Sequence, residues 1–408
     1  MCLATCPTYE MTKLERSSPR GRIRLIKSAA EGEISISNIF TDEMNFCLDC
    51  QACETACPAG VKYGLMVEAA RAEADKAGAG PFFPRLLKRL ALKYILASNK
   101  NLKIFSKVLR IYQKSSFRKF LHTSGIFSIL FPKMAEIDKL SPAVSAEFSD
   151  EKAEEIVSPL TGGIKSKTAF LNGCLMNVMF SEINKDTVGL LSFCGCEIFL
   201  PHSQVCCGSL HAHNGDFETA KKLAKQNIRS FGEREYDFLI SNSAGCGAFM
   251  KQYGDLLKDD PVYAEKAALF STKVKDIMEF LYEADLSLNF NEFNESVTYH
   301  DACHLAHAQK IIDEPRKVLN KIPGLNLKPL QESAWCCGSA GIYNITRYKD
   351  SMIILERKMK NIKDTNAEIV LAGNPGCISQ IKYGAGKFNV KVNVMHPVSF
   401  LYKLLNRQ

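Results

Sequence analysis

A duplicated cysteine pattern constrains this chain more than any other feature of its sequence. Each copy contains a lone cysteine, a Cys-Cys-Gly triplet about thirty residues later, and a second lone cysteine about forty residues beyond. The copies are offset by about 130 residues with little slippage, which indicates a tandem duplication. We interpret the copies as two thiolate sites, formed by Cys174, Cys206, Cys207 and Cys246 and by Cys303, Cys336, Cys337 and Cys377.

Both copies also alternate short apolar segments with helical ones. Strands are expected at 168–172, 197–200, 238–241, 297–300 and 368–371, and helices at 218–231 and 350–363. Alternating strands and helices predict layered α/β modules. The lone cysteines then lie just past the carboxyl ends of strands, where open α/β sheets bind their ligands.

The N-terminal part contains a second cysteine pattern, Cys-x2-Cys-x2-Cys-x3-Cys-Pro, which spans 47–58. This is the bacterial ferredoxin run, in which three cysteines hold one 4Fe-4S cluster and the fourth binds the other cluster. Cys2 and Cys6-Pro7 match only the last two cysteines of such a run. Crossed ligation gives one cluster a full set of four cysteines and leaves the other with Cys2 and Cys57. Either the two clusters are unequal by design or the N-terminus is truncated, and we expect truncation. The full set is Cys6, Cys47, Cys50 and Cys53.

These residues alone do not identify the metal in the duplicated copies. Four thiolates suit zinc as well as iron, so zinc in one copy is an alternative. Nearby histidines could bind metal, donate to cluster sulfurs, protonate a quinone, or be ordinary satisfied polar groups. These histidines are His211, His213, His300, His304 and His307. Four of them are candidates to hydrogen-bond the metal-binding cysteines from outside the ligand set: His211, His213, His304 and His307. Cys194 and Cys196 have no counterpart in the second copy and are expected to be structural.

Composition narrows the class of protein. Sixteen cysteines in 408 residues, without a secretory signal, favour metal or redox chemistry in a cytoplasmic protein over disulfides. No apolar run approaches the ~20 residues that a transmembrane helix needs. No glycine-rich nucleotide motif follows a predicted strand, so we expect no FAD or NAD on this chain. Such a chain is best interpreted as an electron carrier with no catalytic residues of its own.

Residues 81–140 are strongly basic, with thirteen Lys or Arg against Glu136 and Asp138. Their apolar residues recur at three- and four-residue intervals, which predicts amphipathic basic helices. Such helices can lie on an anionic membrane or bind an acidic partner. The alternative is a connector whose lysines are merely solvated. No nucleic-acid-binding motif accompanies the charge, so nucleic acid is not an expected partner.

These patterns predict an α+β multidomain protein. We expect a helical ferredoxin-type 4Fe-4S domain at 1–80 and a basic amphipathic helical segment at 81–145. A linker at 146–166 then leads to two tandem α/β cysteine-rich repeats, at 167–290 and 291–408.

Two ferredoxin runs followed by two Cys…Cys-Cys-Gly…Cys repeats resemble the iron–sulfur subunit family of glycolate oxidase (glycolate dehydrogenase). Residues 2–9, 18–27, 206–213, 300–307 and 336–344 carry the resemblance, which covers essentially the whole chain. The resemblance implies an oxidoreductase subunit, peripheral on the cytoplasmic membrane, that relays electrons toward quinone. Partner subunits with FAD would oxidise glycolate. The family's ferredoxin ligands map onto Cys2, Cys6, Cys47, Cys50, Cys53 and Cys57.

Related families supply the alternatives. The chain is also similar to iron–sulfur subunits of lactate and anaerobic glycerol-3-phosphate dehydrogenases, and to heterodisulfide reductase, whose repeats would themselves be catalytic. In heterodisulfide reductase the repeats end in Cys-x-x-Cys, whereas here Cys246 precedes Gly-Ala-Phe and Cys377 precedes Ile-Ser-Gln. The unusual clusters of that relative are therefore not implied. A scaffold with structural zinc in the repeats is a third hypothesis.

Overall fold

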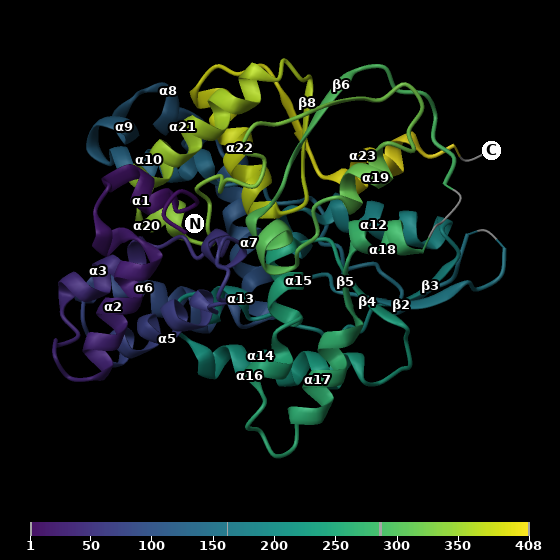
Figure 1. The fold of residues 1–408 in the computed structure, drawn as a ribbon. Coiled ribbons are helices and arrows are strands. Elements are labelled where there is room, and N and C mark those ends of the chain that lie inside the picture. Colours follow the sequence, from purple (N-terminus) through teal and green to yellow (C-terminus); the bar gives the residue numbers. More distant parts are fainter. Residues whose placement is uncertain (1, 161, 285–287, 407–408) are drawn as a thin grey trace.

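The computed structural model describes residues 2–160, 162–284 and 288–406. A helical N-terminal domain lies beside two sheets, and a helical segment connects it to the first of them (Figure 1). The second sheet is parallel throughout, the first is parallel except for one edge strand, and helices pack against both. The predicted fold class, a helical ferredoxin-type domain followed by α/β repeats, is confirmed.

Short helices build the N-terminal domain because proline and serine begin them at defined points. Pro19 occupies the first turn of its helix, and the Ser18 hydroxyl accepts a hydrogen bond from the Gly21 N–H at 3.1 Å. Ser37 caps the next helix in the same way. The elements are α1 (Pro7–Thr12), η1 (Glu15–Ser17), α2 (Pro19–Ala30), α3 (Asn38–Phe46), α4 (Ala52–Thr55) and α5 (Tyr63–Lys76).

The basic segment forms the expected helices and contacts both repeats. Leu102 of α7 packs beside Cys174 and Cys206 of the first repeat. Glu136 of α10 accepts a hydrogen bond from Tyr348 in the second repeat, at 2.9 Å. The elements are α6 (Phe82–Leu90), η2 (Ala91–Leu96), α7 (Asn99–Lys114), α8 (Ser116–Thr123), α9 (Ile126–Leu130) and α10 (Pro132–Leu140).

The first repeat is built on a five-stranded sheet with the order β1-β3-β2-β4-β5. Only β1 is antiparallel; it pairs with β3 and comes from the segment that the sequence indicated as a linker, which is thus partly structured. The elements are β1 (Ile156–Val157), β2 (Ser166–Phe170), α11 (Leu175–Met179), α12 (Ser181–Phe193), β3 (Cys196–Phe199), α13 (Ser209–Ala212), α14 (Phe217–Phe231), β4 (Phe238–Ser241), α15 (Ala244–Met250), α16 (Tyr253–Leu256), α17 (Ala264–Lys273), β5 (Val274–Asp276) and α18 (Ile277–Glu283).

The second repeat has a parallel four-stranded sheet with the order β7-β6-β8-β9. This order matches β3-β2-β4-β5 of the first repeat, so the sequence duplication is also a duplication of topology. The elements are β6 (Ser296–His300), η3 (His304–Ala308), α19 (Glu314–Leu319), β7 (Asn326–Lys328), α20 (Tyr343–Thr346), α21 (Tyr348–Asp364), β8 (Ile369–Ala372), α22 (Pro375–Lys387), β9 (Asn393–Met395) and α23 (Pro397–Leu404).

The two repeats share one hydrophobic core. It contains Phe170 and Ile240 from the first sheet, Val297 and Leu371 from the second, and Phe400 from α23. The last helix, α23, packs on α12 of the first repeat. Because the core is common, the two sheets are held in one fixed relation, and the loops at their carboxyl ends can meet.

The contact between the N-terminal domain and the first repeat depends on Gly215. Its φ is +84°, and a Cβ at this position would lie 2.7–2.9 Å from backbone atoms of Arg71 and Ala72 in α5. We expect Gly215→Ala to lower the free energy of unfolding by about 1–3 kcal/mol through backbone strain and overpacking. Denaturant unfolding measures the change.

Gly386→Ala is the matched control, because a Cβ there meets no atom within 4 Å and the residue lies inside α22. This substitution should leave stability unchanged or raise it by up to about 1 kcal/mol. Equal effects of the two substitutions would contradict the proposed importance of the Gly215 contact.

Candidate metal centres

Four cysteines converge on a small buried cavity in the N-terminal domain. Cys6, Cys47, Cys50 and Cys53 all line it, and these are the four residues that crossed ligation assigns to one cluster. The Asp49 N–H donates to the Cys47 sulfur at 3.3 Å, as backbone amides do around cluster sulfurs. The lining described for this cavity includes neither Cys2 nor Cys57.

Two orphaned polar groups in the same cavity fit an anionic iron–sulfur group. Arg22 is fully buried; its Nε donates to the Glu43 carbonyl and its Nη1 to the Thr8 hydroxyl. Its Nη2 lies 3.8 Å from the Glu43 carboxylate but has no hydrogen-bond partner among the described residues, and neither has the Tyr63 hydroxyl. Both residues line the cavity. A thiolate-ligated cluster with inorganic sulfide would provide the missing acceptors. These residues therefore suit a 4Fe-4S cluster.

All eight repeat cysteines line a single larger cavity of about 1310 Å³, together with Cys47. Ligand sites typically occupy ~300–1,000 Å³, so this cavity has room for metal groups and for a further ligand. The sequence predicted two thiolate sites. The structure brings both sets of cysteines to one chamber, because their loops all leave the carboxyl ends of strands that share a core.

In the first repeat the sulfurs form a connected series. The Cys174 and Cys206 sulfurs are 3.5 Å apart, and the Gly208 N–H lies 3.5 Å from the Cys206 sulfur. Hydrogen bonding from Cys174, and then from Cys207 and His211, holds the pKa of Cys206 well below its usual range. A low thiol pKa favours the thiolate that a metal requires.

The second repeat has a similar series. The Cys337 and Cys377 sulfurs are 3.5 Å apart, and Gly338 donates its N–H to Cys336 at 3.4 Å. Gly338 has a φ of +88°, and a Cβ there would lie 2.7 Å from the Ser351 carbonyl oxygen. The glycine of the triplet is therefore required by the turn and by its approach to α21, and its N–H is directed at the cysteine sulfur.

The crowded, buried sulfurs of the repeats suit a bound cation. Hydrogen bonding to Cys206, followed by burial, raises the pKa of Cys174 well above its usual range. Hydrogen bonding to Cys336, followed by burial, likewise raises the pKa of Cys303. Without a cation, these thiols resist ionisation because several thiolates in one buried site repel one another. A bound metal ion or cluster would remove the protons and offset the charge.

The ferredoxin loop joins the two cavities. Cys47 lines both, and Cys50 belongs to the hydrophobic cluster that contains Cys303 and Cys336. Burial raises the pKa of the Cys50 thiol, and the neighbouring Cys303 raises it further. The N-terminal site thus lies directly against the second repeat.

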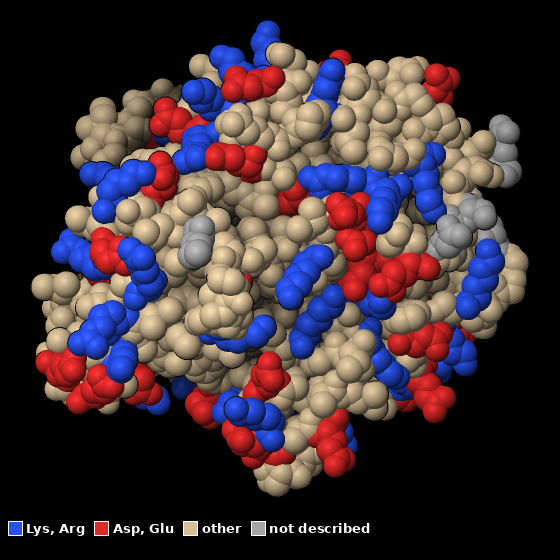
Figure 2. Space-filling view, in the orientation of Figure 1, with Lys and Arg blue, Asp and Glu red and all other residues tan. Residues whose placement is uncertain are grey.

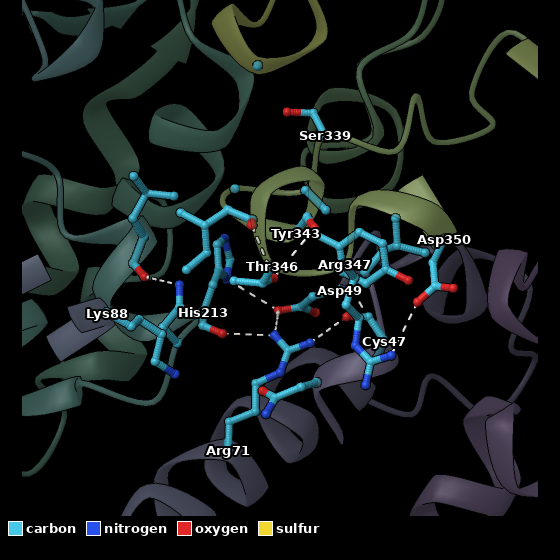
Figure 3. Close-up of a pocket in the computed structure, with 18 of the residues that line it drawn as sticks. Cys47, Asp49, Arg71, Lys88, His213, Ser339, Tyr343, Thr346, Arg347 and Asp350 are labelled. Atoms are coloured by element: carbon cyan, nitrogen blue, oxygen red, sulfur yellow. Dashed lines mark hydrogen bonds and ion pairs between the residues drawn. The ribbon is translucent and has the colours of Figure 1, made fainter. Parts of the chain in front are cut away.

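A buried network around Asp49 holds this loop in place (Figure 3). Arg71 reaches from α5 and donates to the carbonyls of His213 at 2.8 Å, Cys47 at 2.5 Å and Met44 at 3.1 Å. The His213 Nδ1 lies 3.2 Å from Asp49, and Nδ1 also hydrogen-bonds Glu68. Opposing the effect of burial, these two carboxylates raise the pKa of His213 to about 10, so this imidazole is a cation.

The structure gives most of the candidate histidines specific partners. The ring of His304 stacks on that of His213 at 5.0 Å and lies 3.1 Å from the Asp49 carbonyl, while burial lowers its pKa to about 4. His307 contacts Thr55 of the N-terminal domain at 3.1 Å. His211 lies beside Cys206, and its Nε2 is 2.9 Å from the Leu92 carbonyl. His213, His304 and His307 therefore join domains.

Sequence reasoning missed Arg22, Asp49 and Arg71. Asp49 could have been noticed, because a charged residue between the cysteines of the ferredoxin run is expected to be buried. Nothing in the sequence distinguishes Arg22 or Arg71 from the arginines that lie at the surface. Cys194 and Cys196 lie in the shared hydrophobic core, away from both cavities. Their placement agrees with the structural role expected for them.

The geometry of the smaller cavity predicts different effects for two cysteines of the N-terminal domain. Cys6→Ala removes one of four convergent thiols, so iron and acid-labile sulfide should each fall by about four per chain in anaerobically purified protein. Cys57→Ala, the matched control, should leave this cluster in place. Loss of this cluster's own electron paramagnetic resonance signal in both variants would contradict the crossed assignment, whereas loss of iron from the second cluster in Cys57→Ala would not.

Comparison with known proteins agrees with this geometry. Residues 168–251 and 297–382 match the family model described as a cysteine-rich domain. Residues 83–141 match the linker region of the glycolate oxidase iron–sulfur subunit, and residues 1–62 match a 4Fe-4S dicluster domain.

Curated relatives extend the match along the chain. The probable glycolate oxidase iron–sulfur subunit of Bacillus subtilis is 38% identical over 98% of this chain and 91% of its own length. The glycolate oxidase iron–sulfur subunit of Escherichia coli is 28% identical over 96% of this chain and 89% of its own. Lactate utilization protein A of Bacillus licheniformis is 29% identical over only 56% of this chain. The resemblance found in the cysteine motifs is confirmed, and the chain belongs to the glycolate oxidase iron–sulfur subunit family.

Proposed function

We propose that this chain relays electrons from FAD-containing partner subunits, which oxidise glycolate, to a quinone at the cytoplasmic membrane. The observation that carries the proposal is the junction at Cys47 and Cys50, which joins the ferredoxin cavity to the chamber of the repeats. Thiolate sites in contact form a continuous route for single electrons. Bound clusters would supply one-electron carriers, which the side chains alone cannot.

The chain's own residues have defined tasks in this relay. Cys6, Cys47, Cys50 and Cys53 would hold one 4Fe-4S cluster, and Cys2 and Cys57 would belong to the second. The repeat cysteines would hold further iron–sulfur or zinc groups. Arg22 would place a buried positive charge beside the first cluster, which favours its reduced, more negative form.

The basic segment supports contact with a membrane surface. α6, α8 and α9 bury none of their residues, and large apolar side chains stand out from them, such as Phe83 (72% exposed) and Ile129 (77%). Figure 2 shows uncharged surface over α9, with both basic and acidic side chains at its border. Solvated lysines alone would not explain exposed phenylalanine and leucine, whereas an anionic bilayer accepts both groups. No described helix is long and apolar enough to cross a membrane.

The mouth of the large cavity opens beside the same segment. The lining residues that are themselves exposed include Ile39 of α3, Pro84 of α6, Lys133 of α10 and Lys349 of α21. A lipid-soluble acceptor would therefore reach the repeat cysteines from the membrane-facing side. This placement favours a quinone over a soluble carrier.

The relay predicts that Cys50→Ser separates the two halves of the reaction in the assembled complex. Glycolate-dependent reduction of a quinone analogue should fall at least about tenfold, since Cys50 lies between the ferredoxin site and the second repeat. Reduction of a soluble dye at the partner's flavin should continue.

Cys194→Ser, in the hydrophobic core, is the control and should keep both activities. Glycolate oxidation by the isolated chain, or undiminished quinone reduction by the Cys50 variant, would overturn the relay.

Membrane contact predicts a specific effect of charge on the exposed apolar face of α6. Leu87→Glu, at a residue that is 59% exposed, should weaken sedimentation with anionic phospholipid vesicles about tenfold. Leu269→Glu, at a residue 62% exposed on α17, is the matched control and should bind like the unmodified chain. Equal binding by all three proteins would argue for a simple connector.

A further inference from the structure

We propose that His300 is a nitrogen ligand of the metal group in the second repeat, together with Cys337 and Cys377. This inference goes beyond electron relay, because it concerns which atoms hold the metal and is independent of the partner or acceptor. The ligand class is a cation that accepts both thiolate and imidazole, which is iron in a cluster or zinc.

The geometry brings three donor atoms together. His300 is the last residue of β6, and one of its ring nitrogens and the sulfurs of Cys337 and Cys377 all lie within 4.8 Å of one another. The two sulfurs are 3.5 Å apart. A tetrahedral ion with metal–sulfur bonds of ~2.3 Å and metal–nitrogen bonds of ~2.0–2.1 Å needs donors at such separations.

His300 is also a buried polar side chain without a partner. Its relative exposure is 0%, and neither ring nitrogen has a hydrogen bond of standard geometry among the described residues, although the Ser333 backbone lies nearby. Leaving a buried polar group unsatisfied costs ~1–3 kcal/mol, so an unpaired imidazole needs an explanation. His396 is 2% exposed, yet its Nε2 bonds the Asn242 carbonyl and its Nδ1 accepts the Val398 N–H.

The surroundings keep the imidazole available to a metal. Lys358 is buried nearby, but its ammonium donates to the carbonyls of Glu332 and Ser333, at 2.6 and 3.1 Å. Neither ring nitrogen of His300 accepts a hydrogen bond from this ammonium. A neutral imidazole carries the nitrogen lone pair that a metal ion binds.

The first repeat lacks this ligand. The residue three before the first lone cysteine is His300 in the second repeat and Leu171 in the first, where it is 2% exposed. The repeats therefore have the same cysteines but different donor sets. A neutral imidazole in place of a thiolate makes a bound cluster less negative and raises its reduction potential, as in Rieske centres.

Nitrogen ligation can be tested in the full-length, metal-loaded chain without measuring activity. In protein labelled with ¹⁵N-histidine, pulsed electron paramagnetic resonance should detect strong nitrogen coupling to the paramagnetic centre of the second repeat. If that metal is zinc, zinc-edge X-ray absorption should instead show a nitrogen neighbour at ~2.0–2.1 Å beside sulfur at ~2.3 Å.

Substitutions assign the signal to one residue. His300→Leu, which copies the first repeat, should abolish the nitrogen signal and weaken retention of this metal against a chelator at least about tenfold. His300→Cys should retain the metal without the nitrogen signal, which covers the case in which the leucine variant fails to fold. His396→Leu should keep both. A nitrogen signal that survives in His300→Cys, or a metal shell with only sulfur in the unmodified chain, would overturn the proposal.

Discussion

The buried ion-pair network around Asp49 is the interaction on which the rest of the structure depends. Arg71 and protonated His213 compensate Asp49 and Glu68, and Arg71 also satisfies three backbone carbonyls. Removing one partner of such a network leaves an uncompensated buried charge, which is far more costly than the net gain from the intact pairs. The network therefore fixes where the ferredoxin loop lies, and with it the contact of Cys50 with the second repeat.

Duplication explains why a single chamber forms. Each repeat directs its cysteine loops to the carboxyl edge of a parallel sheet, and one face of each sheet packs into a common hydrophobic core that contains both Phe170 and Val297. Two modules sharing a core present these edges in a fixed relation. The same symmetry shows where the repeats differ. His300 of the second repeat is equivalent to Leu171 of the first, at a buried position where packing alone would favour an apolar side chain.

Much of the fold could be predicted from local patterns. The expected strand at 238–241 coincides with β4, and the expected helix at 218–231 differs by one residue from α14. The short strand β1 was missed because a two-residue strand in a Ser- and Pro-rich segment has no periodicity to detect. The histidines were ambiguous for a related reason: a spacing does not reveal whether a ring nitrogen faces a sulfur, as at His211, or another domain, as at His307.

The sequence by itself determined the kinds of ligand and their grouping. Cysteine spacing is a local property, since the backbone between Cys47 and Cys53 can place its thiols in few ways, and the duplication repeats the same strand-end positions. Only the tertiary structure decided that both repeats and the ferredoxin loop share a chamber and that Arg22 and Asp49 are buried charges. It also decided that the ring of His300 has no hydrogen bond of standard geometry within the described part of the chain. These facts depend on contacts between residues up to 255 positions apart, such as Asp49 with His304. Such contacts arise from packing of whole domains, which no local spacing encodes.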